Sequence, residues 1–193
     1  MFRLNLVCVL SLVWLFCSPA LAADAGTPPR PTGLRGELLR TLDHIEQQTV
    51  SLEQAMPEAK FTWRPGKGVR SVSELYLHIA GSIYVILTDK LGREAPADVQ
   101  ALLMKAGKWE SQTTKKDEIK AILTTAFAYV RNAILETNDA DLDKQVKFMG
   151  QEVSLRFVLM ATQFHSMRHL GQAIAYARIN GVVPPWSKGE AKD

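Results

Sequence analysis

The sequence predicts an all-α protein, an up-and-down four-helix bundle. Apolar residues recur every three or four positions in four separate stretches, and a glycine or proline stands near the end of most of them. The connections between the stretches are of modest length, which is typical of a bundle. One interruption is expected, a short irregular or extended excursion before the last helix.

The first 22 residues are predicted to be a secretory signal peptide that takes no part in the fold. Arg3 precedes an almost unbroken apolar run over 4–17, and Ala20-Leu21-Ala22 fits a small-x-small cleavage site. The run is shorter than the about 20 apolar residues of a membrane span, and a retained N-terminal anchor is the alternative. We therefore expect an exported protein, periplasmic or secreted, with no stable membrane insertion after cleavage.

Composition narrows the classes of partner and chemistry. Both cysteines, Cys8 and Cys17, lie in the predicted signal peptide, so the mature chain would lack disulfides, thiol nucleophiles and cysteine ligands. The 23 basic and 20 acidic residues nearly balance. They form no basic block with interleaved aromatics, which argues against a nucleic-acid partner. The expected partner is a small-molecule substrate.

The mature chain is expected to hold one domain. A flexible Pro-rich lead-in over 23–33 precedes a bundle domain over 34–187, and a short tail follows over 188–193. No internal repeat at a fixed period is evident.

The first two helices have clear boundaries. Apolar spacing predicts a helix from Leu34 to Met56, and the Pro- and Gly-containing segment 60–69 is expected to be a loop. Ser71-Val-Ser-Glu74 is typical of a capping box that opens the second helix, and Gly92 is expected to end it. A polar stretch with at most one short helix follows through residue 109.

The second half of the domain is expected to hold two further helices. Thr114-Lys-Lys-Asp117 is predicted to cap a third helix that carries apolar residues as far as Ile134. Residues 139–152 break the helical pattern and include the Gly150 turn, which gives the expected excursion. Ser154 is expected to cap a last helix that runs to Asn180.

Three histidines indicate a metal site. His165 and His169 are four positions apart and therefore share one face of the last helix, while His78 lies on the apolar seam of the second helix. Three protein ligands leave a coordination position open, which is typical of reactive metal sites. Buried, hydrogen-bonded histidines without a metal are the alternative. His44, the fourth histidine, lies beside the main apolar stripe and is expected at the surface or rim.

The inward direction of the pair follows from the spacing of the last helix. Its predicted buried seam repeats at intervals of four and three: Val158, Thr162, His165, His169, Gln172 and Tyr176. A polar break in such a seam costs free energy unless it is satisfied.

Other residues are candidates for supporting roles. Glu74, one helical turn before His78, is a candidate catalytic or proton-transfer group, with a plain capping role as the alternative. Arg168 and Trp63 are candidates for substrate binding, Arg168 toward an anionic group, and aromatic packing over the end of the bundle is the alternative for Trp63. Gln163 or Gln172 could orient a ligand histidine, and ordinary polar positions on the helix are the alternative for both.

Four sequence motifs together resemble the DinB-like (DinB/YfiT) superfamily of metal-binding four-helix proteins. They are Phe61-Thr-Trp-Arg-Pro65, Ser73-Glu-Leu-Tyr-Leu-His-Ile79, His165-Ser-Met-Arg-His-Leu-Gly-Gln172 and Ile179-Asn-Gly-Val-Val-Pro-Pro-Trp186. The resemblance covers nearly the whole mature chain, from about residue 34 to 186.

The resemblance implies that His78, His165 and His169 hold a divalent ion, zinc or nickel first among the candidates, with water in the remaining positions. It also implies a homodimer. Some relatives are thiol-dependent S-transferases or isomerases, and many others have no known activity. The predicted export signal argues against a thiol transferase, because reduced small thiols are scarce outside the cytoplasm.

The sequence thus favours an exported, metal-dependent hydrolase- or transferase-like enzyme that acts on an unidentified small molecule. The alternative is a non-catalytic metal-binding or small-molecule-binding module with the same fold. A metal-free helical protein is a third possibility.

Overall fold

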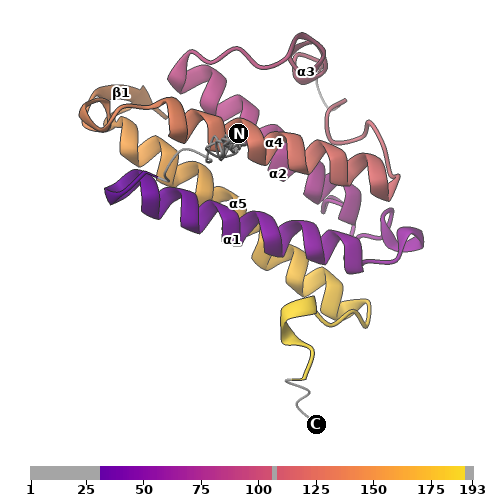
Figure 1. The fold of residues 1–193 in the computed structure, drawn as a ribbon. Coiled ribbons are helices and arrows are strands. Elements are labelled where there is room, and N and C mark those ends of the chain that lie inside the picture. The colour runs from indigo at the N-terminus through magenta and orange to yellow at the C-terminus, as the bar shows by residue number, and fades with distance from the viewer. Residues whose placement is uncertain (1–30, 106–107, 190–193) are drawn as a thin grey trace, which may run out of the picture. The chain divides into compact units, whose positions relative to one another are not determined.

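The computed structural model describes residues 31–105 and 108–189. The predicted signal peptide, most of the lead-in and the end of the tail lie outside them. Four long helices form a bundle, so the predicted fold class is confirmed (Figure 1). These helices are α1 (Gly33–Ala55), α2 (Val72–Leu91), α4 (Lys116–Glu136) and α5 (Leu155–Ile179). Shorter elements are α3 (Ala97–Leu103) and the single turns η1 (Glu58–Lys60), η2 (Asp139–Asp141) and η3 (Pro185–Ser187).

The boundaries of α2 follow from local signals in the sequence. The Ser71 side chain accepts a hydrogen bond from the Glu74 backbone N–H at 3.3 Å, and the Glu74 carboxylate accepts one from the Ser71 N–H at 2.8 Å. This capping box satisfies two N–H groups that have no partner within the helix. Gly92 ends α2 in the left-handed conformation with φ of 60°. Both predicted ends are confirmed.

The predicted caps of the last two helices are less accurate. Lys115 takes the N-cap position of α4, where Thr114 was expected. The neighbouring Thr113 hydroxyl accepts a hydrogen bond from the Lys115 N–H at 3.1 Å and donates one to Glu118 at 2.5 Å. Ser154 does occupy the N-cap of α5, but its side chain makes no capping hydrogen bond.

The expected excursion before α5 is a two-stranded hairpin. Strands β1 (Gln145–Phe148) and β2 (Gln151–Ser154) pair antiparallel, with Phe148 opposite Gln151. Met149 and Gly150 form its turn, both with positive φ, which suits a two-residue hairpin.

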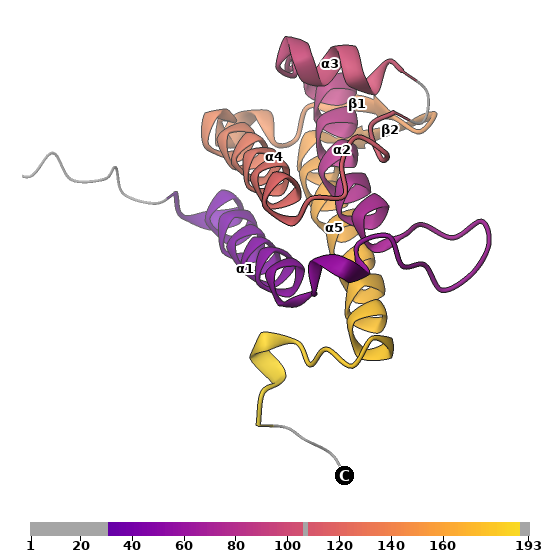
Figure 2. The ribbon, with the colours of Figure 1, turned by 90° about the vertical axis from the view of Figure 1, so that its right-hand side faces the viewer.

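The four-helix bundle is as predicted, but the helix directions differ from the expected up-and-down order. Arg70, just before α2, pairs with Glu110, ahead of α4, and Arg93, just after α2, pairs with Glu136 at the end of α4. Consequently α2 and α4 run in the same direction, which the long connection through α3 allows (Figures 1 and 2).

The remaining helices complete an up, down, down, up pattern. Lys116 at the start of α4 donates to the Gln54 carbonyl near the end of α1, so these helices are antiparallel. The Tyr176 hydroxyl of α5 donates to the Arg70 carbonyl, which makes α5 antiparallel to α2. The main contacts join α1 to α4 and α5, and α2 to the same two helices. Helices α2 and α5 are therefore direct neighbours.

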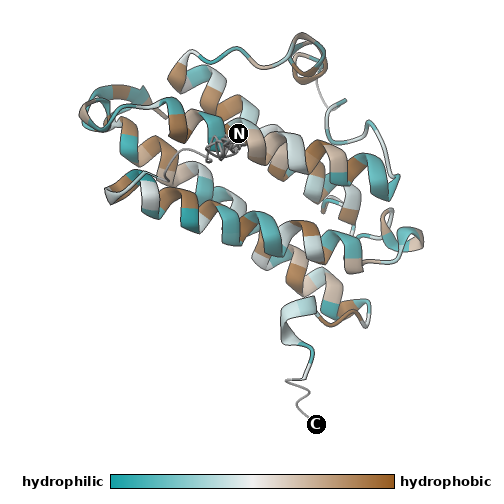
Figure 3. Cartoon of the chain, viewed as in Figure 1, coloured by the Kyte–Doolittle hydropathy of each residue, from teal (hydrophilic) through white to brown (hydrophobic). Residues whose placement is uncertain are grey.

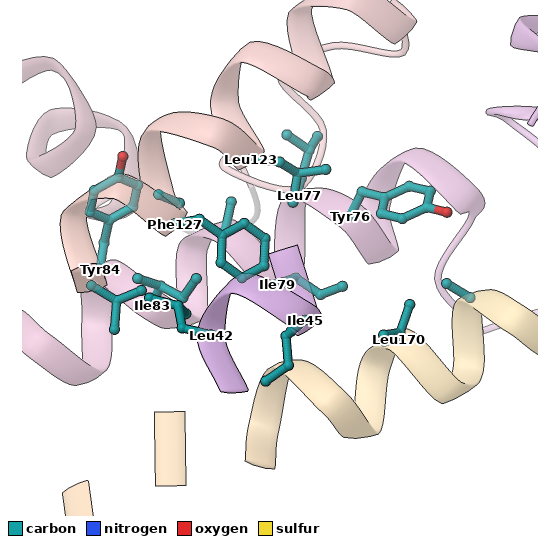
Figure 4. Close-up of a cluster of buried hydrophobic side chains, with 14 of the residues drawn as sticks. Leu42, Ile45, Tyr76, Leu77, Ile79, Ile83, Tyr84, Leu123, Phe127 and Leu170 are labelled. Carbon is teal, nitrogen blue, oxygen red and sulfur yellow. The ribbon is translucent and has the colours of Figure 1, made fainter. Parts of the chain in front are cut away.

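The apolar faces of the four long helices meet in one core. Figure 3 shows hydrophobic (brown) and hydrophilic (teal) residues interspersed along these helices. Figure 4 shows side chains from all four: Leu42 and Ile45 of α1, Leu77, Ile79 and Ile83 of α2, Leu123 and Phe127 of α4, and Leu170 of α5. Full burial of each such side chain stabilises the fold by about 1.5–3 kcal/mol. This core fixes α2 and α5 against each other. Among the described residues, no helix has the length and apolar character to cross a bilayer.

Candidate metal centre

The antiparallel packing of α2 and α5 brings the three predicted histidines together. The ring centre of His78 lies 5.2 Å from that of His165 and 4.6 Å from that of His169, and the last two are 4.6 Å apart. One nitrogen from each ring lies within 4.8 Å of the other two. Tetrahedral zinc, with Zn–N bonds of about 2.0–2.1 Å, needs ligand nitrogens roughly 3.3 Å apart. Small side-chain rotations would therefore suffice to hold one ion.

A carboxylate holds His78 from outside the cluster. His78 Nδ1 lies 2.7 Å from Glu110 Oε1. Since a carboxylate only accepts hydrogen bonds, this nitrogen carries a proton, and Nε2 is the nitrogen that offers a lone pair in the neutral ring. Arg70 binds the same carboxylate through Nε at 2.7 Å and a terminal nitrogen at 3.0 Å. Burial acts to raise the pKa of Glu110, but the hydrogen bonds from Arg70 and His78 outweigh it and lower that pKa.

An amide holds His169 in the same way. Gln172 donates from its amide nitrogen to the Tyr176 hydroxyl at 2.8 Å, so its oxygen accepts from His169 Nδ1 at 3.1 Å. The Tyr176 hydroxyl in turn donates to the Arg70 carbonyl at 3.1 Å. Arg70 therefore supports two of the three histidines, His78 through its side chain and His169 through its main chain.

His165 differs from the other two. Its Nε2 is buried and has no hydrogen-bond partner, and an unsatisfied buried polar atom costs about 1–3 kcal/mol. Burial, followed by the neighbouring His169 and His78, lowers the pKa of His165 to about 4. Burial also lowers the pKa of His169. Both rings are thus neutral near pH 7, which is the form that binds metal.

A tryptophan anchors the loop that carries Glu110. The Trp109 indole N–H donates to the Leu77 carbonyl of α2 at 2.5 Å. A Cβ at Gly81 would lie 2.3 Å from that indole nitrogen. Glycine at position 81 therefore lets the Trp109 indole lie directly against α2. Glu110, the residue after Trp109, then reaches His78.

Sequence reasoning missed Glu110. This residue is 32 positions from His78 and lies in a polar stretch without periodicity. The one available signal was the lone Trp109 beside it, an aromatic residue that marks a point where the polar stretch docks on the bundle.

The predicted supporting residues are distributed around the cluster. Glu74 accepts from Ser71 in the capping box and pairs with Arg64 at 3.0 Å, so both of its oxygens are engaged. Although burial opposes the change, these hydrogen bonds lower the pKa of Glu74. Trp63 packs edge-on against Tyr176, with ring centres 5.4 Å apart.

The two candidate glutamines, Gln163 and Gln172, have different hydrogen-bond partners. Gln172 bonds to His169, which is the orienting role considered for either glutamine, whereas Gln163 donates to the Leu38 carbonyl of α1 at 2.9 Å. His44 is exposed, as expected, on the outer face of α1.

The cluster lies between two pockets of opposite character. A pocket of about 790 Å³ between α2, the hairpin and α5 has mostly apolar walls, and His165 and Arg168 line it. A second pocket of about 510 Å³ is polar, and its lining includes Glu74 together with Glu110 and Gln172, the partners of His78 and His169. The apolar pocket thus reaches His165 itself, whereas the polar pocket reaches the hydrogen-bond partners of the other two histidines.

A model of the DinB superfamily matches residues 41–173. The chain belongs to the DinB superfamily. The matched range contains all three clustered histidines and Glu110, so the DinB domain and the candidate metal centre coincide.

Solved structures of DinB-like proteins have the same fold. A DinB-like protein from Bacillus cereus is 20% identical with a TM-score of 0.62, and the match covers 77% of this chain and 93% of that one. A conserved protein from Enterococcus faecalis is 17% identical with a TM-score of 0.63, covering 77% and 97%. YfiT from Bacillus subtilis, described as a probable metal-dependent hydrolase with an unusual four-helix bundle topology, is 15% identical with a TM-score of 0.59, covering 82% and 95%. No curated protein matches the sequence significantly.

Proposed function

We propose that this DinB-superfamily protein is exported and binds one divalent ion through His78, His165 and His169, as a hydrolase- or transferase-like enzyme for a small molecule. The observation that carries the proposal is the buried, unpartnered Nε2 of His165 beside two histidines whose Nδ1 atoms are already bonded. Three imidazoles suit zinc, copper, iron and nickel better than magnesium or calcium. We expect zinc or nickel.

The side chains around the site have defined tasks. Glu110 and Gln172 accept the Nδ1 protons of His78 and His169, which leaves the Nε2 lone pairs available and fixes both rings. Arg70 keeps Glu110 ionised and in place. A divalent ion held there would polarise a substrate carbonyl or lower the pKa of a bound water. The description of YfiT as a probable metal-dependent hydrolase supports this direction.

The non-catalytic alternative has support of its own. Hydrolysis usually needs a carboxylate base within reach of the attacking water. Glu110 is bound by Arg70 and His78, and Glu74 by Arg64 and Ser71. A metal-binding or small-molecule-binding module would need no free base. A small thiol as co-substrate is disfavoured by the predicted export.

Elemental analysis of the mature protein, Ala23 to Asp193, purified without a histidine tag, tests the metal site. We expect about one equivalent of a divalent ion in the wild type, and its loss in the double variant His165→Ala/His169→Ala. His44→Ala, an exposed histidine change on α1, is the matched control and should keep the metal. No metal after reconstitution, or equal loss in all variants, would refute the site.

Export and oligomeric state are tested separately. Mass spectrometry of protein from a periplasmic extract should give a chain that begins at Ala23, whereas an unprocessed chain in the membrane fraction would indicate a retained anchor. The homodimer is supported by the family resemblance alone, and sedimentation equilibrium should give twice the mass of one chain. A monomer at all concentrations would contradict it.

A further inference from the structure

The apolar pocket beside His165 is built from three separate elements, and we call it the hairpin pocket. Ser82, Val85 and Ile86 of α2 form one wall, the hairpin turn at 148–150 a second, and Phe157 with the following turns of α5 the third. Its volume of about 790 Å³ lies within the range of small-molecule sites, about 300–1,000 Å³.

Its apolar walls are exposed to solvent. Met149 is 86% exposed, and Val85, Phe157 and Phe164 are between 44% and 53% exposed. Large apolar side chains gathered on one face usually mark a binding surface. The rings of Phe148 and Phe157 pack edge to face with centres 6.2 Å apart, which ties the hairpin to α5 and forms this wall before any ligand arrives.

The α5 wall of the pocket holds His165 and Arg168 as well as aromatic side chains. The spacing along the helix keeps Phe157, Phe164 and Arg168 on one face of α5. His165 lies between the last two, so a ligand against the aromatic wall would be next to the proposed metal. The Arg168 side chain is exposed at the pocket.

The charges within the pocket favour one orientation. Asp89 lines it from α2, and Arg168 is the cation that lines it from α5. Arg168 offers a planar cation that binds carboxylates or sulfonates in a bidentate manner. An anion is therefore best placed on the α5 side.

We propose that the hairpin pocket holds the substrate of the metal site, a small molecule with an aromatic ring or short acyl chain and one anionic group that Arg168 binds. This inference rests on the proposed function, since it takes the ion at His165 as the reactive centre. The apolar part would lie against Phe157 and Phe164. The pocket's size, its continuity with His165 and its single cation on α5 favour a small molecule over a second copy of the chain.

Dye titration tests this assignment on the mature protein. The probes are anilinonaphthalene sulfonate, an aromatic anion whose fluorescence rises on apolar surfaces, and anilinonaphthalene, which lacks the sulfonate. Arg168→Gln should weaken the anionic dye about tenfold and the neutral dye less than about twofold. Phe157→Ala should weaken both by about fivefold. Circular dichroism confirms that each variant is folded.

Two matched controls lie outside the pocket. Arg178→Gln removes another exposed arginine from α5, and Leu135→Ala removes an apolar side chain of α4 that is 44% exposed, as Phe157 is. Neither should change the affinity of either dye. Equal effects from Arg168→Gln and Arg178→Gln, or no effect from Phe157→Ala, would overturn the assignment.

Metal content measured on the same samples separates the two proposals. If the protein binds the ion but the Arg168 and Phe157 variants bind the dyes as tightly as the wild type, the pocket assignment is wrong and the metal site is retained. Absent metal with the expected dye pattern would refute the proposed function and keep the pocket as a binding site. If Phe157→Ala instead converts a dimer to a monomer without affecting the dyes, the face is an interface and the pocket assignment fails.

Discussion

Helix α2 contributes to two groups of polar side chains, one half-buried and one fully buried, that differ in their surroundings. In the half-buried histidine cluster, each of two members has a bonded partner outside the cluster, and the apolar pocket reaches His165. In the second group, Glu53 and Thr49 of α1 and Tyr76 of α2 are at most 1% exposed, and one oxygen of each has no partner. We call these three residues the Glu53 group.

Burial favours the uncharged form in both groups, which is the deprotonated ring for His165 and the protonated carboxyl for Glu53. Burial lowers the pKa of His165 to about 4, so that ring loses its proton easily and offers a lone pair. Burial raises the pKa of Glu53 to about 7, against the opposing effects of Gln54, Lys116 and Lys120, so that carboxyl keeps its proton. Burial and the nearby Glu53 also raise the pKa of Tyr76.

The comparison shows that an unpartnered buried atom does not by itself mark a functional site. Both groups contain such atoms. In the histidine cluster, such an atom on His165 lies at a pocket and beside two rings, those of His78 and His169, that outside partners hold in place. The variants and titrations below test this distinction.

Metal addition should produce the largest difference between the two groups. A ligand that binds only the folded state at 1,000 times its Kd stabilises the protein by about 4 kcal/mol. We expect zinc or nickel to raise the melting temperature of the wild type and of Glu53→Gln equally, measured by calorimetry. The variant His165→Ala/His169→Ala should not respond. A reduced response in Glu53→Gln would mean that the two groups are coupled.

The Glu53 group should give the protein a pH dependence of its own. The folded pKa of Glu53, about 7, lies above the 4.5 of an unperturbed Glu side chain. Between these values the folded state holds the proton and the unfolded state does not, so this contribution is complete below pH 4.5 and is lost as the pH rises to about 7. The difference is about 3 kcal/mol.

Urea unfolding of the wild type and Glu53→Gln at pH 5 and pH 8 isolates this contribution. Subtraction is needed because the lowered pKa of His165 acts in the opposite sense, adding stability as the pH rises from about 4 to 6.5. The variant should lose less stability than the wild type on going to pH 8. Glu37→Gln, an exposed change on the same helix, should follow the wild type. Identical slopes in all three proteins would contradict the expectation.

The sequence predicted those parts of the molecule that depend on nearby residues. The capping box of Ser71 and Glu74, the stop at Gly92 and the turn at Gly150 each involve neighbours along the chain. Helical spacing places His165 and His169 on one face of α5, although both rings are half-buried and the fully buried face runs through Ser166 and Leu170. Local rules sufficed for the four helices, whereas the gathering of the three histidines also needs α2 and α5 to be neighbours, and the triad came from the family resemblance.

The parts that could not be predicted depend on long connections. The parallel run of α2 and α4 is set by the path through α3, which no periodicity records. The same path brings Glu110 to His78. Glu74 seemed the better acidic candidate because it is close in sequence, although its oxygens bond to Ser71 and Arg64. The carboxylate partner of His78 thus comes from a loop distant in sequence, and not from the acidic residue one turn away on the same helix.

Removal of the Glu110 carboxylate should lower the metal affinity without abolishing metal binding. Loss of a carboxylate partner of a ligand histidine typically costs 10–100-fold in metal affinity. We expect this loss for Glu110→Gln in competition titrations with a metal chelator. Glu136→Gln, which also removes an arginine-paired carboxylate, should leave the affinity unchanged. Equal affinities for wild type and Glu110→Gln would show that His78 needs no such partner.

The smallest expected effect separates the two roles of Glu74. If this residue only caps α2, Glu74→Ala should lower the free energy of unfolding by about 1 kcal/mol, as the loss of a cap does, while metal affinity stays the same. Ser71→Ala, which removes the other half of the capping box, should lower it by a similar amount. If turnover of a substrate, once one is found, falls much further in Glu74→Ala than in Ser71→Ala at equal stability, then Glu74 acts in catalysis. The pair of variants therefore distinguishes a helix cap from a proton-transfer group, since both variants disrupt the capping box but only Glu74→Ala removes a carboxyl that could transfer a proton.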